Sequence, residues 1–169
     1  FNPEMWPVAE TVKYVFPGTQ YTAGDKINVT WYDGGRKPAR ELAQLPEGKE
    51  LPGAGSIFIG EGGTMIMPHV GMPQLYPEAK FADYKQPDVE ALSHWHVWVD
   101  AVLNNTKTSD GFHYSGPLSE ATQLGNIAAM HPGKTLEWDA AALKFTNAPE
   151  ANALLTKKYR KGFEVEAVV

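Results

Sequence analysis

The hydrophobic pattern changes its period once along this chain, and that change limits the folds open to it. Up to about residue 67, apolar and polar residues alternate in short runs bounded by Gly and Pro, which is typical of β-strands. From residue 88 onward, apolar residues recur with the helical period of about 3.6. Strands followed by helices, with hairpin-type connections, predict an α+β fold: a mainly antiparallel open β-sheet with helices packed on one face.

The expected strands fall into two pairs. The first pair is residues 10 to 16 and 26 to 32, and the turn signal Asp33-Gly34-Gly35 follows it. The second pair is SIFIG at 56–60 and TMIM at 64–67, with a tight Gly-rich hairpin between them. The proline-rich stretches between and after the pairs, 36–55 and 68–87, are expected to be irregular loops over the surface, because Pro interrupts regular structure.

Two long helices are expected in the second half. One spans 88–105, with Asp88 as N-cap, and the other spans 117–130, with Pro117 in the first turn. Gly125 in the second helix suggests close packing against another element, because Gly costs about 1 kcal/mol against Ala there. The pattern also predicts a short strand at 136–139 and a last helix at 150–160.

Composition excludes several classes of protein. The 169 residues suffice for one domain, and no apolar run is long enough to cross a bilayer. Net charge is −5 and the Lys and Arg residues are scattered, so nucleic acid and anionic membrane are poor partners. The absence of cysteine excludes disulfides, thiolate zinc sites and a cysteine nucleophile. The first residue is Phe1, and we expect a processed product or a sequence that starts in mid-protein.

Most candidate chemistry has an ordinary structural explanation. The Gly-rich segment 53–63 flanks strands and does not open a helix, so a hairpin is favoured over a phosphate loop. His94 and His96 are two apart on a helix and diverge, which argues against a shared metal ion and favours His96 in a core or interface and His94 facing a pocket. Ser119-Glu120 suits the start of a helix better than a nucleophile site. Asp33 and Asp139 sit at strand ends, where carboxylates bind sugar hydroxyls but more often make turns.

Several motifs, in order, resemble the C-terminal domain of one family. The resemblance is to the glucose–fructose oxidoreductase, inositol dehydrogenase and MocA (Gfo/Idh/MocA) oxidoreductases, and most of all to their bacterial branch. It covers roughly residues 10 to 163. The segments that carry it are TWYDGG (30–35) with Pro38, SIFIGEGGTM (56–65), SHWHVWVDAV (93–102), GPLSEATQLGNIA (116–128), LEWD (136–139), Asn147, Glu150-Ala151-Asn152 and Tyr159-Arg160-Lys161-Gly162.

This resemblance implies that residues 1–169 are the substrate-side and oligomerisation domain of a two-domain enzyme. Hydride transfer from a sugar or cyclitol hydroxyl would use NAD or NADP held by an N-terminal Rossmann domain. That domain is absent from this sequence, as are the family's E-K-P lysine and its D-x-x-x-H acid/base. No catalytic, cofactor-binding or metal-binding residue is therefore assigned. The resemblance is compatible with a two-domain parent enzyme that is either cytoplasmic or exported to the periplasm. The candidates for lining a substrate pocket are Trp31, Asp33, Gly34, Gly35 and His94.

Two other functions stay open beside this one. A stand-alone carbohydrate-binding module would use exposed Trp and Tyr side chains to stack on sugar rings. A metal-dependent hydrolase would draw on the histidines at 69, 94, 96 and 113. Sugar affinity of the chain would favour the first of these, and stoichiometric zinc the second.

Self-association through the sheet is the last expectation. If helices cover one face while both faces carry apolar residues, an apolar patch remains exposed, and such patches mark interfaces. In 10–16, one face carries Val12, Tyr14 and Phe16, and the other carries Val15. In 26–32, one face carries Ile27, Val29 and Trp31, and the other carries Tyr32. Closed two-fold pairing of this face is the expected form of a homo-oligomer, as the family resemblance also implies.

Overall fold

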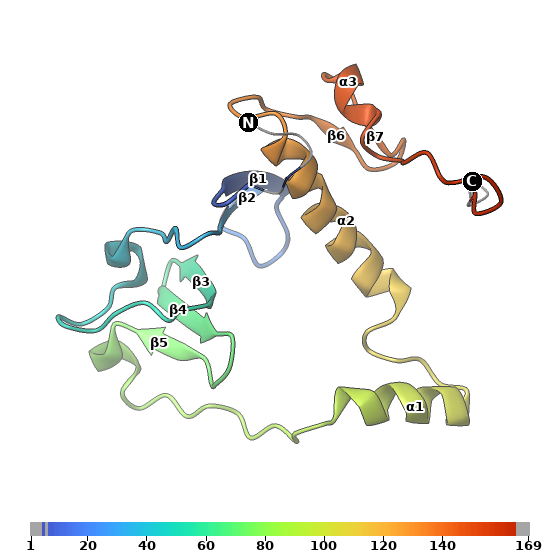
Figure 1. Ribbon diagram of the computed structural model, residues 1–169. Coiled ribbons are helices and arrows are strands. Elements are labelled where there is room, and N and C mark those ends of the chain that lie inside the picture. Colours follow the sequence, from blue (N-terminus) through green and yellow to red (C-terminus); the bar gives the residue numbers. More distant parts are fainter. Residues whose placement is uncertain (1–4, 6, 165–169) are drawn as a thin grey trace. The chain divides into compact units, whose positions relative to one another are not determined.

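The computed structural model describes residues 5 and 7–164 and divides the chain into two compact units. The first, here called the N-terminal unit, is Val8–Ser93; the second, the C-terminal unit, is His94–Val169 together with Phe1–Pro7. Antiparallel strands and helices both occur, which confirms the α+β class. Figure 1 labels the elements.

The first strand pair forms as expected. Strands β1 (Thr11–Pro17) and β2 (Lys26–Tyr32) pair antiparallel, with Thr11 opposite Tyr32 and Pro17 opposite Lys26. Hydrogen bonds continue the ladder past both ends: Gly18 N donates to Asp25 O at 2.7 Å, and Asp33 N donates to Glu10 O at 3.1 Å. The pairing therefore reaches one residue beyond each strand, and it places Glu10 opposite Asp33.

This register divides the side chains between the two faces as the sequence pattern predicted. Alternation along each strand puts cross-strand partners on the same face. One face then carries an unbroken apolar set, and the other carries mainly polar residues around Val15 and Tyr32. Val15 and Tyr32 lie on the second face, as the sequence pattern predicted. The apolar face consists of Val12, Tyr14, Phe16, Ile27, Val29 and Trp31.

The second sheet has three strands in the order β3-β4-β5. Strands β3 (Gly55–Gly60) and β4 (Gly63–Pro68) form the expected hairpin, closed by Glu61-Gly62. Strand β5 (Gln74–Tyr76) pairs with β4 on the other side (Figure 1). It lies within 68–87, which the sequence assigned to loop. Prolines flank β5 closely on both sides, and that is tolerated because it is a short edge strand.

The core of the N-terminal unit lies on one face of this sheet. Ile66 and Tyr76 are 1% exposed and pack against Ala43 and Leu45. The last two come from the 36–55 stretch, which contains the 3₁₀ helix η1 (Arg40–Ala43). That stretch therefore covers the sheet instead of only running over the surface. The buried Thr64 hydroxyl donates to Ala43 O at 2.8 Å and ties the two layers together.

The two strand pairs do not join. Strand β2 belongs to the two-stranded sheet and β4 to the three-stranded one, so the expectation of one sheet containing 26–32 and 62–67 is wrong. The physical reason lies in the 36–55 stretch. Ala43 and Leu45 of this stretch pack against Ile66 of β4 and Tyr76 of β5. No described backbone hydrogen bond links β2 to β3. The covering of a sheet face by the long helices stays a prediction.

The long helices of the C-terminal unit begin at other residues than expected. Helix α1 spans His94–Asn104, so Asp88 lies six residues before its first residue and is not its N-cap. Helix α2 spans Phe112–Ala129. It begins on the Gly111 carbonyl, which accepts from Ser115 N at 3.0 Å, so Pro117 lies inside the helix and not in its first turn. Gly125 is buried, in keeping with the expected close packing.

A small core closes the C-terminal unit around the end of α2. Strands β6 (Trp138–Asp139) and β7 (Lys144–Phe145) form a hairpin, and the helix α3 (Pro149–Asn152) follows. Helix α3 has four residues, so the expected helix over 150–160 is wrong for most of its length. The buried members of this core are Ile127, Phe145, Ala148 and Ala151.

Two asparagine side chains brace this core through backbone groups. Asn152 Nδ2 donates to Phe145 O at 3.1 Å, and its Oδ1 accepts from Phe145 N at 2.7 Å. Asn147 Nδ2 donates to Thr135 O at 2.9 Å, and its Oδ1 accepts from Glu137 N at 2.9 Å. Each amide thus replaces a missing strand partner. Because the Asn152 side chain faces β7, the chain leaves the helical path there.

No helix in the described part of the chain is both long and apolar enough to cross a membrane.

Candidate functional site

Three side chains with sugar-binding chemistry gather at one end of the β1–β2 sheet. Trp31 faces Val12, and the next pair along the same face is Asp33 and Glu10. Trp31 is 52% exposed, so much of its indole is open. We call Glu10, Trp31 and Asp33 the carboxylate–tryptophan site. Its members come from both strands, and the ladder fixes their order along the face.

The turn after β2 holds this site in place. Gly34 has φ of +63°, and a Cβ built on it would lie 2.2 Å from Val8 O and 2.4 Å from Ala9 Cα. Only glycine allows both this backbone conformation and the close approach of the segment that leads into Glu10. Arg36 closes the turn: its N donates to Asp33 O at 3.2 Å, and its Nη1 donates to Thr11 Oγ1 at 3.3 Å.

The electrostatics of the site centre on Glu10. Burial raises the pKa of its carboxyl above the ordinary value of 4.5, and the negative charge of Asp33 raises it further. Oε2 of Glu10 is buried, and none of the described groups donates a hydrogen bond to it. Burial also raises the pKa of the Tyr14 phenol, which lies beyond Val12 on the same face, and the negative charge of Glu10 raises it further. The site therefore contains a buried carboxylate oxygen to which no described group donates a hydrogen bond.

Replacing Glu10 by Gln is expected to make stability less dependent on pH. A carboxyl whose pKa is raised in the folded state binds protons more tightly there than in the unfolded chain. It therefore opposes folding as pH rises above the ordinary pKa of 4.5. Below that pH both states hold the proton and the effect vanishes. We expect Glu10→Gln to raise the melting temperature at pH 7 and to leave it nearly unchanged at pH 4, as followed by circular dichroism.

Asp25→Asn is the matched control, because Asp25 lies at the opposite end of the same ladder. An equal rise for Glu10→Gln at both pH values would show that the carboxyl charge is not the cause.

Hydroxyl recognition is the chemistry that this arrangement suits. Carboxylate oxygens accept hydrogen bonds from hydroxyl groups, and the exposed carboxylate of Asp33 offers such oxygens beside Trp31. The open face of an indole packs well against the C–H face of a ring that carries polar groups at its rim. The remainder of the apolar face, toward Val29, offers no further described carboxylate. One ring-sized, hydroxyl-rich molecule fits this distribution of groups.

The structure brings together some of the sequence-predicted residues and separates one. Trp31 and Asp33 share a face, while Gly34 and Gly35 act through the backbone of the turn, both with positive φ. His94 is the first residue of α1 in the C-terminal unit, so its place beside the others stays a prediction.

Sequence reasoning missed Glu10. The signal was available in the pairing of the two strands, since counting back from the Asp33 turn places residue 10 opposite residue 33. The predicted strand over 10 to 16 included Glu10, but the pattern did not show which residue of 26–35 lies opposite it.

The other histidine and helix expectations have clear outcomes. His94 packs on Trp95 with ring centroids 4.6 Å apart, and its charge helps to lower the pKa of Asp110, after a larger effect of the Thr108 hydroxyl. His96 is exposed, so it does not lie in a core, and its expected alternative place in an interface stays a prediction. Among the described residues, no three His, Asp or Glu side chains are placed to hold a metal ion.

Glu120 lies well inside α2 and not at its start. Its Oε1 accepts from the indole Nε1 of Trp138 at 2.8 Å. Glu120 thus links the helix to β6, which is a structural role, as expected, but by a different bond from capping.

Two shallow hollows lie beside the three-stranded sheet, each with a volume of about 260 Å³. Leu75 and Phe81 line both. Phe58 and Met65 belong to one hollow, while Glu78 and Tyr84 belong to the other. Both are wide open to solvent. They lack the paired carboxylates of the carboxylate–tryptophan site, so we do not assign a substrate to them.

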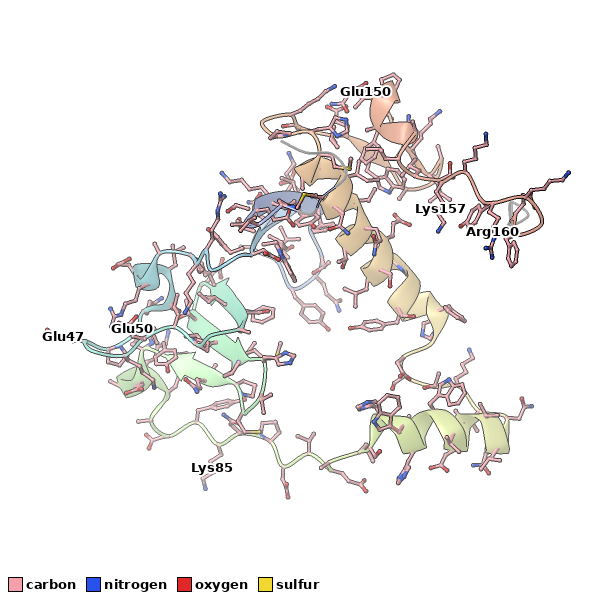
Figure 2. The ribbon with its side chains drawn as sticks, in the orientation of Figure 1. Glu47, Glu50, Lys85, Glu150, Lys157 and Arg160 are labelled. Atoms are coloured by element: carbon pink, nitrogen blue, oxygen red, sulfur yellow. The ribbon has the colours of Figure 1, made fainter. Side chains whose placement is uncertain are left out.

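The basic residues are less scattered than the sequence-based assessment held. Lys157, Lys158, Arg160 and Lys161 follow one another closely after α3 and are exposed (Figure 2 labels Lys157 and Arg160). Lys157 Nζ lies 5.1 Å from the ring centre of Tyr159, and the Arg160 guanidinium lies 3.9 Å from that of Phe163. These cations are thus matched with neighbouring rings, which is an ordinary local arrangement.

Comparison with known proteins gave no match: no family model fits the chain, and neither curated proteins nor solved structures include a significant relative.

Proposed function

We propose that this chain is the substrate-side domain of an NAD(P)-dependent oxidoreductase of the Gfo/Idh/MocA type that acts on a sugar or cyclitol hydroxyl. The observation that carries the proposal is the carboxylate–tryptophan site. It combines an open indole with two carboxylates on one face, and one carboxylate oxygen lacks a described donor. The ordered motif resemblance of residues 10 to 163 supplies the reaction class.

The residues described here do not fit a dinucleotide. A Rossmann site needs a Gly-rich turn that leads from a strand into a helix. The glycines at 60–63 instead close the β3–β4 hairpin, and the helix that follows the Gly34-Gly35 turn, η1, is a four-residue 3₁₀ helix and not an α-helix that begins at the turn. In this proposal the nicotinamide cofactor and the catalytic lysine belong to a separate Rossmann domain. This chain's part is to bind and orient the substrate.

Within that division of labour each site residue has a task. Trp31 supports one face of the sugar or cyclitol ring. Asp33, which is exposed, accepts hydrogen bonds from its hydroxyl groups, and Glu10 lies beside Asp33 with its Oε2 buried. Self-association through the apolar face belongs to the same proposal. Ile27, Val29 and Trp31 on that face are each 40% exposed or more, and an apolar face of this kind marks an interface.

The alternative is a stand-alone carbohydrate-binding module, and the same site supports it. The two functions differ in what else the complete protein does. An oxidoreductase made from the complete coding sequence would reduce NAD⁺ or NADP⁺ in the presence of sugar or inositol, whereas a binding module would bind sugar and leave both nucleotides unchanged.

Sugar binding by the chain should depend on Trp31. We expect glucose or myo-inositol, titrated by nuclear magnetic resonance, to shift the indole N–H signal of Trp31 and the amide signals of Asp33 and Gly34. Trp31→Ala should weaken binding about tenfold or more, because it removes the ring that packs on the sugar. Asp33→Asn should weaken it less, since the amide still accepts one hydrogen bond.

Trp95→Ala is the control, because Trp95 is 72% exposed on a helix of the other unit. Equal loss of binding for both tryptophan variants, or no shift at residues 31–34 under saturating sugar, would contradict the assignment of the site. NAD⁺ and NADP⁺ alone should produce no shifts anywhere in the chain.

A further inference from the structure

Strand β3 has an unprotected edge. It is the outer strand of the order β3-β4-β5, and its sequence Gly55–Gly60 contains no charged residue and no proline. Five of its six residues are exposed. An uncharged, exposed edge strand is a template for another strand, because its backbone donors and acceptors are unpaired.

The other described edges carry the usual protections. Strand β1 contains Lys13 and ends at Pro17, and β2 begins at Lys26. Strand β5 has three residues between Pro73 and Pro77, and the β6–β7 hairpin has two residues in each strand. Charge, proline and shortness are the devices that keep strand edges apart. Among the strands that the structure describes, β3 alone lacks all of them.

The register shows which backbone groups of β3 point outward. His69 N donates to Ala54 O at 3.0 Å, and the hairpin closes at Gly60 opposite Gly63. Hydrogen-bonded residues alternate along an antiparallel strand, so Ser56 and Phe58 also bond to β4. Ile57 and Ile59 therefore direct their N–H and C=O groups to the open edge. No described backbone or side-chain bond involves these groups on that side.

We propose that this edge pairs with the β3 edge of a second copy of the chain, antiparallel and about a two-fold axis at Phe58. Ile57 of each copy then lies opposite Ile59 of the other, and each of these pairs exchanges two backbone hydrogen bonds. The two Phe58 rings, each 48% exposed in a single copy, meet across the axis at a non-hydrogen-bonded position, where side chains come closest.

The strand suits its own copy for three reasons. Every residue in the paired stretch 57–59 is apolar, so each meets an apolar partner and no like charges oppose one another. Antiparallel self-pairing is closed, and it ends at a dimer. The result is a six-stranded sheet in which Ile57 of both copies faces the layer that covers Ile66. This interface is separate from the apolar face of the β1–β2 sheet, and it is independent of the proposed oxidoreductase function.

The test compares two substitutions of Ile59, which is 62% exposed. Ile59→Pro removes the outward N–H but leaves the β3–β4 bonds in place, whereas Ile59→Ala keeps that N–H. By sedimentation equilibrium we expect the wild-type chain and Ile59→Ala to dimerise at micromolar concentrations. Ile59→Pro should raise the dimer dissociation constant about tenfold or more, because it removes two symmetry-related hydrogen bonds.

A second variant keeps the test valid if the proline disturbs the hairpin. Phe58→Lys changes an exposed side chain and sets two ammonium groups opposite each other at the axis, so it should also abolish the dimer. Val29→Lys, on the apolar face of the other sheet, should leave this dimer intact. Hydrogen exchange of the Ile57 and Ile59 amides should slow as the concentration of wild-type chain rises.

Several results would overturn the proposal. One is a chain that stays monomeric at all concentrations, including a monomer in which the Ile57 and Ile59 amides are already protected by the chain itself. Another is equal dimerisation of Ile59→Pro and Ile59→Ala with Phe58→Lys unaffected. A dimer that Val29→Lys dissolves and Phe58→Lys does not would place the interface on the apolar face instead.

Discussion

Replacing Ile66 by Ala is expected to lower the free energy of unfolding by about 2–5 kcal/mol, the usual cost of truncating a large buried side chain. Ile66 is 1% exposed on the central strand β4 and packs against Ala43, Leu45 and Tyr76. Because this core is small, few neighbours can move in to fill the space. Urea unfolding followed by circular dichroism measures the change.

Ile59→Ala is the matched control for this prediction, because Ile59 lies on the neighbouring strand β3 but is 62% exposed. At concentrations low enough to keep the chain monomeric, it should change stability by no more than about 0.5 kcal/mol. Similar losses at both positions would mean that the packing of 36–55 onto β4 and β5 is not the main source of stability in this unit.

Replacing Gly34 by Ala should destabilise the N-terminal unit and also disable the carboxylate–tryptophan site. The positive φ costs a residue with a Cβ about 1–2 kcal/mol, and the overlap with Val8 O and Ala9 forces a backbone shift of similar cost. We therefore expect a loss of about 2–4 kcal/mol in unfolding free energy. The backbone shift at Val8 and Ala9 also displaces Glu10, which follows Ala9, so the affinity for sugar should decrease as well.

Gly35→Ala separates the two causes. Gly35 also has positive φ, at +82°, but a Cβ there would meet no atom within 4 Å. It should cost only the conformational part, about 1–2 kcal/mol, and leave the site intact. If both glycine variants lose the same stability and the same sugar binding, the close approach of residues 8–9 to the turn has no functional role.

Local patterns predicted the strands well. Residues 26–32 and the hairpin joining β3 to β4 agree with the structure almost to the residue. Alternation and the Gly-rich turns are local signals, so they needed no knowledge of the rest of the chain. Trp31 and Asp33 became site candidates through the family resemblance, whereas the local pattern placed Asp33 only at a strand end.

Features that depend on contacts between distant segments were missed. Strand β5 exists because Tyr76 fills the core beneath β4, and its flanking prolines hid it in the sequence. The start of α1 was misplaced because both Asp88 and Ser93 are good cap types, and composition cannot choose between them. Likewise the role of Glu10 depends on the register of β1 against β2, which no single strand reveals.

The side-chain amides of Asn147 and Asn152 hold the core of the C-terminal unit together, so the stability of this unit depends on their resistance to hydrolysis. Each amide donates to one backbone carbonyl and accepts from one backbone N–H. Hydrolysis to a carboxylate keeps the acceptor but removes the donor, and it sets a negative oxygen against the carbonyl of Thr135 or Phe145. Asparagine is a thermolabile residue. Ageing of the protein in warm storage should therefore open this unit at its β6–β7 hairpin, without any change in the N-terminal unit's own contacts.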